Sequence, residues 1–173
     1  MQRFNLSVSI LLLMTLRTAI ITDLLTIVSI YNEFIDTTIT MDTEKATYNS
    51  KEEWFKNHND DYPILCDFSN ENLTGWASLS KWSEKGGYRK SVELSVYVSK
   101  KYQRHGIGKK LVEEAINRAI KKKYHCIISR IDADNRISLE LHKKFGFTQV
   151  GILKESGFKF GRFIDIIVLQ LLI

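Results

Sequence analysis

The chain has 173 residues, of which 44% are hydrophobic and 26% charged, and its formal net charge is +5. This size and composition are ordinary for one globular domain that buries its own core, and they exclude a small chain that needs disulfides to fold. The two cysteines, Cys66 and Cys126, lie in separate apolar stretches, so we expect buried thiols in a reducing, cytoplasmic compartment. The four histidines form no HxxxH or HExxH pair, so we expect no metal site.

Residues 1–13 are apolar after one basic residue and superficially resemble a signal peptide. The stretch is too short for a membrane span, and no clear small-x-small cleavage site follows it. MTLRTAI, which begins at Met14, already reads as a strand. We therefore expect 1–13 to be an upstream extension and 14–173 to form a single domain, with a cleaved signal as the alternative.

Apolar periodicity predicts elements in the order β-α-α-β-β-β-α-β-α-β-β, an α/β (α+β) domain with a sheet of mixed direction. The chain begins with a strand at 14–20 and a helix capped by Thr22 or Asp23. A short helix follows, started by an S-x-x-E capping box of Ser50 and Glu53. The later expected elements are strands at 63–68, 73–82 and 91–98, a helix at 107–122, a strand at 124–132, a helix at 135–146 closed by Gly146, and strands at 147–153 and 162–173 around a loop at 154–161.

The segment QRHGIGKK, residues 103–110, joins a predicted strand to the start of a predicted helix. It matches neither the P-loop GxxxxGK[ST] nor the dinucleotide GxGxxG, whose third glycine is replaced by Leu111. Backbone N–H groups at a helix N-terminus lack partners, and glycine lets a phosphate approach them closely. The segment therefore predicts a cradle for a pyrophosphate, although a turn without a ligand fits these residues equally well.

Residues 100–123 contain nine Lys or Arg and two Glu. A solvated helix face, an anionic ligand or a nucleic acid would each explain this charge. No nucleic-acid motif accompanies it, and aromatic residues are not interleaved as a stacking surface requires. We expect a small polyanion as the ligand, with no nucleic acid and no membrane as partner.

Several segments in register resemble the GNAT N-acetyltransferase superfamily, and in particular its phosphinothricin and methionine sulfone (sulfoximine) acetyltransferases. They are IYNEFI, MDTEKAT, GWASL, VELSVYVSKKYQRHGIGKKL, IDADNRISLELHKKFGF and GFKFGRFIDIIVLQL. The resemblance covers nearly the whole chain from about Leu16. It implies a mixed, mostly antiparallel sheet of six to seven strands that splays at a cofactor cleft, with about four flanking helices. It also implies transfer of an acetyl group from acetyl-CoA to the amine of a small amino-acid-like substrate.

The resemblance implies that Glu93 is the general base. A base is needed because an ammonium group has no lone pair until it loses a proton. Alternation in SVELSVYV places Glu93 on the strand face opposite the apolar residues, where a solvent-facing carboxylate is the alternative. His142 stands where many relatives carry a tyrosine that protonates the departing thiolate, and a structural histidine is the alternative there.

The residues expected to bind acetyl-CoA are Val96, Tyr97 and Val98 through their backbone, the loop residues Arg104, His105, Gly106, Ile107, Gly108 and Lys109, and Asn135 at the start of a helix. For the substrate, Arg89 is the expected partner of an α-carboxylate, and Tyr31 and Tyr88 are expected to line the pocket. For Arg89 an ordinary loop arginine is the alternative, and for the two tyrosines it is core packing.

The resemblance and the apolar C-terminal strand FIDIIVLQLLI also predict a homodimer, unless that strand is central in its own sheet. Three alternatives to amino-acid acetylation stay open. They are acetylation of another amine (a peptide N-terminus or an antibiotic), a non-catalytic acyl-CoA-binding protein, and a basic nucleic-acid-binding module.

Overall fold

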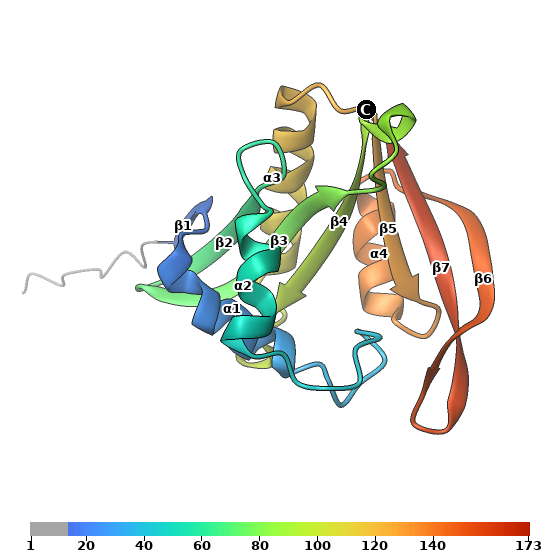
Figure 1. Cartoon of the computed structure of the whole chain (residues 1–173), viewed down its shortest axis with the longest axis horizontal. Helices are drawn as coiled ribbons and strands as arrows, with labels where there is room; N and C mark the ends of the chain where they lie inside the picture. The colour runs from blue at the N-terminus through green and yellow to red at the C-terminus, as the bar shows by residue number, and fades with distance from the viewer. Residues whose placement is uncertain (1–13) are drawn as a thin grey trace, which may run out of the picture.

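The computed structural model describes residues 14–173, so the expectation for residues 1–13 lies outside the described part of the chain (Figure 1). Seven strands and four α-helices follow one another in the predicted order, with three short 3₁₀ turns between them. The elements are β1 (Met14–Thr18), α1 (Leu24–Asn32), α2 (Tyr48–Lys56), β2 (Ile64–Ser69), β3 (Asn72–Lys81), β4 (Ser91–Val98), α3 (Ile107–Lys121), β5 (Cys126–Asp132), α4 (Arg136–Lys144), β6 (Thr148–Lys159) and β7 (Arg162–Leu172). The predicted fold class is confirmed.

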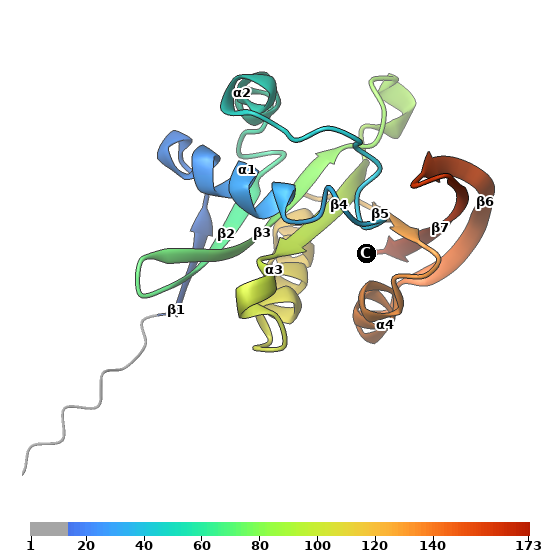
Figure 2. The same ribbon diagram turned by 90° about the horizontal axis from the view of Figure 1, so that it is seen from below.

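The strands form one sheet in the order β1-β2-β3-β4-β5-β7-β6. Neighbouring strands are antiparallel except β4 and β5, which run parallel. Figure 2 shows α1 and α2 on one face of the sheet and α3 and α4 on the other. The sheet is therefore mixed but mostly antiparallel, as expected.

Helix α3 and the middle strands form the main core. Leu111, Val112, Ala115 and Ala119 recur at helical spacing and are completely buried against the sheet. Gly75 on β3 makes this close packing possible, because a Cβ there would lie 2.9 Å from the Tyr97 carbonyl oxygen. The glycine in GWASL therefore serves the contact between β3, β4 and α3.

Helix α2 is capped one turn earlier than predicted. The Thr47 hydroxyl accepts a bond from the Ser50 N–H (3.1 Å), and the Thr47 N–H donates to the Ser50 hydroxyl (2.9 Å). Ser50 is thus the third residue of the helix, and the predicted Ser50–Glu53 capping box is wrong. Thr47 and Ser50 have the same spacing as the predicted pair, but the usual capping box has Glu or Gln at its fourth place, so the pattern favoured Ser50 and Glu53.

The caps of two other helices confirm the predicted positions. Asp23 is the N-cap residue of α1, but its carboxylate binds Arg17 at 2.7 Å instead of the helix. Gly146 follows the C-cap of α4 with φ +86, the left-handed conformation that favours glycine.

Strand β6 corrects a predicted loop. Residues 154–161 were expected to be irregular, yet β6 continues to Lys159 and only Phe160 and Gly161 form the turn. Pairing with β7 imposes the extended conformation on this polar, glycine-containing stretch, apart from an irregularity between Leu153 and Gly157. Long-range pairing of this kind cannot be read from local propensity.

The position of β7 also removes one argument for a homodimer. β7 is paired along both edges, with β5 on one side and β6 on the other, so its apolar residues need no second subunit to cover the strand. β6 is the edge strand. Cys66 and Cys126 are both buried and free, which confirms the predicted burial of the two thiols.

Candidate active site

The sheet opens between β4 and β5. The two strands pair only where Ser91–Glu93 meet Cys126–Ile128, and beyond Glu93 they diverge, as Figure 1 shows. β4 stays paired with β3 as far as Val98. The splay expected from the resemblance is therefore present, and Glu93 is the last paired residue before it.

The backbone of β4 faces this opening at alternate residues. The Leu94 carbonyl accepts a bond from the Ser129 hydroxyl on β5 (3.3 Å), so the backbone of Leu94 points toward β5. Residues two and four positions later share this direction in a strand, which places Val96 and Val98 on the same side. Tyr97 lies between them and turns its backbone toward β3. Of the three residues expected to bind the cofactor, Tyr97 can therefore offer the opening its side chain but not its N–H.

A narrow cavity of about 60 Å³ occupies the opening. It is lined by side chains from β4, β5 and the first two turns of α4, among others Val96, Tyr97, Arg130, Asn135, Ser138 and His142. Asn135 accepts a bond from the Ser138 N–H (3.2 Å) and is the N-cap of α4. The expected cofactor residues on β4 and α4 thus meet on the two sides of one gap.

The loop before α3 lies at the end of the same opening, directly after β4. Gly106 is the N-cap of α3 with φ +78, and no atom stands within 4 Å of the position where its Cβ would be. Arg104, His105 and Lys109 are exposed around this helix N-terminus, whereas the Ile107 side chain is only 2% exposed and belongs to the core. Ile107 can therefore offer only its backbone to a ligand, and a Cβ added at Gly108 would lie 3.4 Å from the Leu141 side chain.

Glu93 forms a two-pronged ion pair with Arg130 on β5. The distances are 2.7 Å from Nε to one carboxylate oxygen and 2.9 Å from Nη2 to the other. The Glu93 side chain is 18% exposed and that of Arg130 52%. The bond to Glu93 raises the pKa of Arg130, so the guanidinium stays charged. The candidate base is thus held by a partner that the sequence did not identify.

A second, wider cavity of about 160 Å³ lies beside Glu93 on the face covered by α1 and α2. The register of β3 and β4 sets Ser80 opposite Glu93 and Ser78 opposite Ser95. The three serines line the cavity, together with Ile27, Val28, Tyr31, Lys51, Trp54, Trp76 and Tyr97. Ser95 and Tyr97 line both cavities, and Glu93, which lines neither, shares their face of β4 at the position two residues before Ser95.

Aromatic rings and a lysine shape the wider cavity. Tyr97 lies 4.7 Å from Trp76 and 5.2 Å from Tyr31 between ring centroids, and burial raises its pKa to about 12. Lys51 lies above the Tyr31 ring at 4.6 Å and 3.6 Å from the Asp42 carboxylate. The indole N–H of Trp76 is buried without a hydrogen-bond partner. This cavity therefore offers hydroxyl groups, an indole N–H and a cation.

The geometry does not favour His142 as a general acid. Its Nδ1 lies 2.8 Å from the Ser138 carbonyl oxygen and therefore carries the proton, which leaves Nε2 as a buried acceptor without a partner. Burial lowers the pKa of His142, so the ring is neutral near pH 7. A neutral ring whose N–H is already engaged cannot readily protonate a thiolate.

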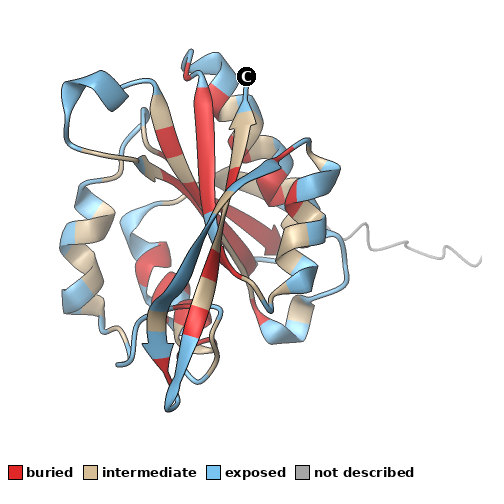
Figure 3. Cartoon of the chain, turned by 90° about the vertical axis from the view of Figure 1, so that its right-hand side faces the viewer, coloured by how far each residue is buried: buried red, intermediate tan, exposed pale blue. Residues whose placement is uncertain are grey.

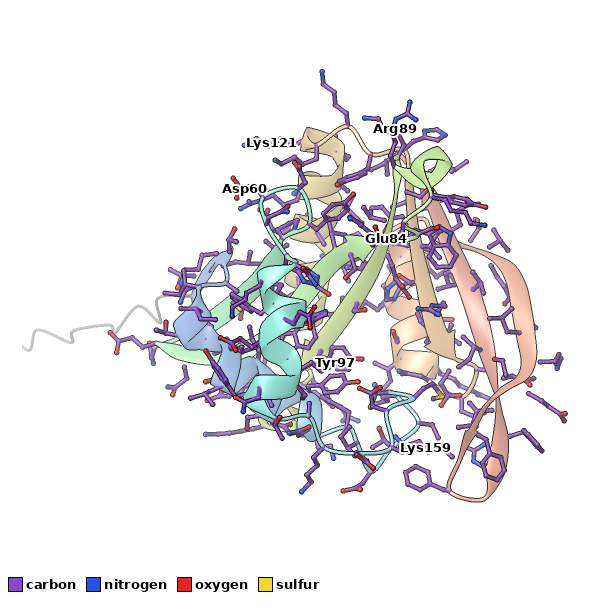
Figure 4. All side chains as sticks on the ribbon, viewed as in Figure 1. Asp60, Glu84, Arg89, Tyr97, Lys121 and Lys159 are labelled. Atoms are coloured by element: carbon purple, nitrogen blue, oxygen red, sulfur yellow. The ribbon has the colours of Figure 1, made fainter. Side chains whose placement is uncertain are left out.

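Arg89 and Tyr88 lie outside both cavities. They belong to the turn before β4, and Figure 4 shows Arg89 at the opposite end of that strand from Tyr97. Arg89 bonds weakly to the Gly86 carbonyl (3.4 Å), and Tyr88 is 49% exposed. Arg89 stands four positions before Glu93, and although neither residue lines a cavity, the expectation that they bind substrate stays a prediction. Tyr31 does line the wider cavity, as expected.

The sequence did not identify Arg130, Lys51 or the three serines of the wider cavity (Ser78, Ser80 and Ser95) as site residues. Arg130 interrupts the apolar strand CIISRID, and that charge within a strand was the available signal. Only the parallel pairing of β4 and β5 shows that it meets Glu93. Within residues 14–173 no cluster of three or more His, Cys, Asp or Glu could hold a metal ion. The same residues include no helix long and apolar enough to cross a membrane.

Comparison with known proteins gives the same picture. Residues 27–147 match the Acetyltransferase (GNAT) family. The chain is 33% identical over 166 residues to the L-methionine sulfoximine/L-methionine sulfone acetyltransferase of Salmonella typhimurium, covering 91% of this chain and 94% of that protein. It is also 33% identical to the phosphinothricin N-acetyltransferase of Streptomyces coelicolor, over 83% and 87% of the two chains.

A solved structure agrees with these relatives. The Salmonella typhimurium protein yncA, a putative acetyltransferase in complex with its cofactor acetyl-CoA, superposes with a TM-score of 0.88. The two chains are 32% identical, and the match covers 92% of this chain and 93% of yncA. With the split sheet, the bare helix N-terminus and the paired Glu93 already described, the conclusion is direct: the chain belongs to the GNAT family and is an N-acetyltransferase.

Proposed function

We propose that the protein transfers the acetyl group of acetyl-CoA to the α-amine of a small amino acid of the methionine sulfone, methionine sulfoximine or phosphinothricin type. The observation that carries this proposal is that two cavities share the lining residues Ser95 and Tyr97, on the face of β4 that also carries Glu93. A cofactor in the narrow gap and an amine in the wider cavity would be in contact there. The names of the relatives support this substrate class.

The residues present fit acetyl-CoA. Gly106 leaves open space in front of the first N–H groups of α3, where a pyrophosphate is favoured by unpaired donors and the helix dipole. Arg104, His105 and Lys109 add donors around it. The narrow gap contains a buried acceptor without a partner, His142 Nε2, which suits an amide N–H of the pantetheine arm. We assign His142 this binding role in place of the acid role.

In the proposed reaction Glu93 accepts a proton from the substrate ammonium, directly or through a water molecule, and the neutral amine attacks the thioester carbonyl. The N–H of Val96 points into the gap and would polarise that carbonyl, the role of an oxyanion hole. When bound, acetyl-CoA would supply a thioester whose C–S bond would break as the new C–N bond forms, and its thiol, being fairly acidic as thiols are, could leave as thiolate without an acid.

The wider cavity fits a side chain that carries oxygen atoms. The hydroxyls of Ser78 and Ser95 and the buried, unpaired indole N–H of Trp76 can donate hydrogen bonds to sulfone or phosphinate oxygens. The Ser80 hydroxyl is already engaged, because it donates to His58 Nε2 (3.1 Å), whose ring carries its proton on Nδ1 toward the Trp54 carbonyl. A purely aliphatic side chain would leave these donors without partners, which costs binding free energy. This property of the cavity favours the oxidised sulfur and phosphorus compounds over plain aliphatic amino acids.

A thiol-release assay over a panel of amines tests the proposal. L-methionine sulfone, L-methionine sulfoximine and phosphinothricin should release CoA thiol at saturable rates, and aminoacyl peptides, an aminoglycoside and norleucine should react at least about tenfold less efficiently. Activity confined to the peptides or to the aminoglycoside would refute the substrate class. Binding of acetyl-CoA without thiol release from any amine would favour the non-catalytic alternative.

A further inference from the structure

Arg130 is hydrogen-bonded to Glu93, the carboxylate that the proposed reaction needs as its base. Its guanidinium makes both hydrogen bonds of a two-pronged pair with Glu93, at 2.7 and 2.9 Å, and lies 5.7 Å from the Trp82 ring. A carboxylate held in this way has fewer lone pairs free for an incoming ammonium group. Arg130 must therefore share Glu93 with the substrate or release it during turnover.

Both partners of this ion pair are accessible and are joined to no other charged side chain. Within residues 14–173, Glu93 is the carboxylate that Arg130 contacts, and Arg130 is the cation that Glu93 contacts. Half of the Arg130 side chain is exposed, so the guanidinium can turn without unpacking the core. The pair is therefore held by its own two bonds.

An α-amino acid carries the two groups that can replace these bonds. Its ammonium group can take the place of the guanidinium on Glu93, while its carboxylate, attached to the same α-carbon, takes the place of Glu93 on the guanidinium. Arginine binds carboxylates in the two-pronged geometry that it already adopts here. We propose that Arg130 binds the α-carboxylate of the substrate, and that this exchange of partners frees Glu93 to accept the ammonium proton. The proposal rests on the proposed function.

The other cations near the site are less suited to this task. Lys51 lies across the wider cavity on α2, engaged with Asp42 at 3.6 Å and with the Tyr31 ring. Arg89 precedes β4 by two positions, bonds to the Gly86 carbonyl at 3.4 Å and lines neither cavity. A carboxylate joined through one carbon to an amine at Glu93 must stay within a few ångströms of Glu93, and Arg130 is the cation in hydrogen-bond contact with it.

The test compares two substrates that differ only in the α-carboxylate. They are L-methionine sulfone and 3-(methylsulfonyl)propan-1-amine, assayed at one pH with the wild type and with Arg130→Met and Arg130→Lys. Arg130→Met should lower kcat/KM for the amino acid by about 10²–10³-fold and change it for the amine by less than about threefold. Arg130→Lys should fall between, because an ammonium keeps the charge but loses the fork.

Two further variants complete the design. Arg118→Met removes an arginine–glutamate pair of the same 2.7 Å length on α3, and it should leave both substrates unchanged. Lys51→Met removes the rival cation. Thermal unfolding and acetyl-CoA titration of each variant show whether the fold and the cofactor affinity are retained.

Several outcomes would overturn the proposal. An equal loss on both substrates would mean that Arg130 only orients Glu93, and unchanged kinetics would mean that it has no role. A loss of acetyl-CoA affinity in Arg130→Met would place the residue in the cofactor site. If Lys51→Met lost the preference for the substrate that carries the α-carboxylate, and Arg130→Met kept it, Lys51 would be the residue that binds this carboxylate. A wild type that acetylates neither compound but acetylates other amines would refute the proposed substrate class instead.

Discussion

The two halves of the sheet are built differently. β1 to β4 lie between α1 and α2 on one face and α3 on the other, and seven consecutive residues of β3 are buried. In β6, at the opposite edge, Lys159 alone of twelve residues is buried, and most of the others are exposed (Figure 3). The first half is a closed core, and the second half is covered mainly on one side.

The candidate site lies where these halves separate. Three residue pairs join β4 to β5, and the rest of that boundary is open. A continuous sheet would satisfy its backbone groups internally, whereas this boundary leaves the N–H groups of Val96 and Val98 facing a gap. The candidate site therefore depends on an interruption of the sheet between β4 and β5. The buried N-terminal half, β1 to β4, forms one side of that interruption.

Replacing the candidate base at this boundary should have the largest effect on catalysis. Glu93→Gln keeps the side-chain volume but cannot accept a proton, so kcat at pH 7 should fall by about 10²–10⁴-fold, or roughly 3–5 kcal/mol of barrier. Acetyl-CoA affinity should stay unchanged, and the loss should shrink at higher pH because free amine then forms unaided. Steady-state kinetics at two pH values measure this, and wild-type turnover at pH 7 would place the base elsewhere.

Truncation of a leucine in each half tests the difference in packing. Leu79 on β3 is completely buried, whereas Leu172 on β7 is 61% exposed. Leu79→Ala should lower the free energy of unfolding by about 2–5 kcal/mol, because it removes buried methyl groups and leaves a cavity. Leu172→Ala should change it by less than about 0.5 kcal/mol. Urea unfolding compares the two variants, and equal losses would contradict the difference in burial between these two positions.

Gly106, the N-cap of α3, should be needed for cofactor binding because of its left-handed backbone conformation. Gly106→Val places a β-branched residue at φ +78, which costs about 1–2 kcal/mol of stability and distorts the proposed anion cradle. Calorimetric titration should detect acetyl-CoA binding that is weakened or lost. Gly86→Val is the matched control, since a Cβ there meets nothing within 4 Å and φ is not positive. Normal cofactor binding by Gly106→Val would refute the cradle.

The open half suggests where a second copy of the chain would bind, and we propose a homodimer formed there. Phe158, Phe160 and Phe163 at the end of the β6–β7 hairpin are about 60% exposed each, an apolar cluster that a monomer rarely leaves uncovered. Light scattering at micromolar concentration should give twice the 20.1 kDa chain mass.

Replacing Phe158 and Phe163 together by serine should reduce that mass to one chain. The monomer itself should lose at most about 1.5 kcal/mol, the contribution of their ring pair at 5.1 Å. A monomeric wild type would remove the dimer proposal.

Much of the fold follows from local patterns. Helical spacing in 107–122 and strict alternation in SVELSVYV predicted α3 and β4, because each element buries one face and therefore repeats its apolar residues with its own period. Gly106 and Gly146 marked a helix start and a helix end, since only a few residues tolerate a left-handed backbone. The face of Glu93 also followed from alternation alone.

The tertiary structure decided what those residues meet. Arg130 is 37 positions from Glu93, and only the parallel pairing of β4 and β5 joins them. Burial makes His142 on α4 a neutral acceptor, and the turn before β4 engages Arg89 with the Gly86 carbonyl instead of a cavity. A sequence pattern records the side of an element on which a residue lies. Hydrogen-bond partners, burial and charge state depend on segments distant along the chain, which only the folded molecule brings into contact.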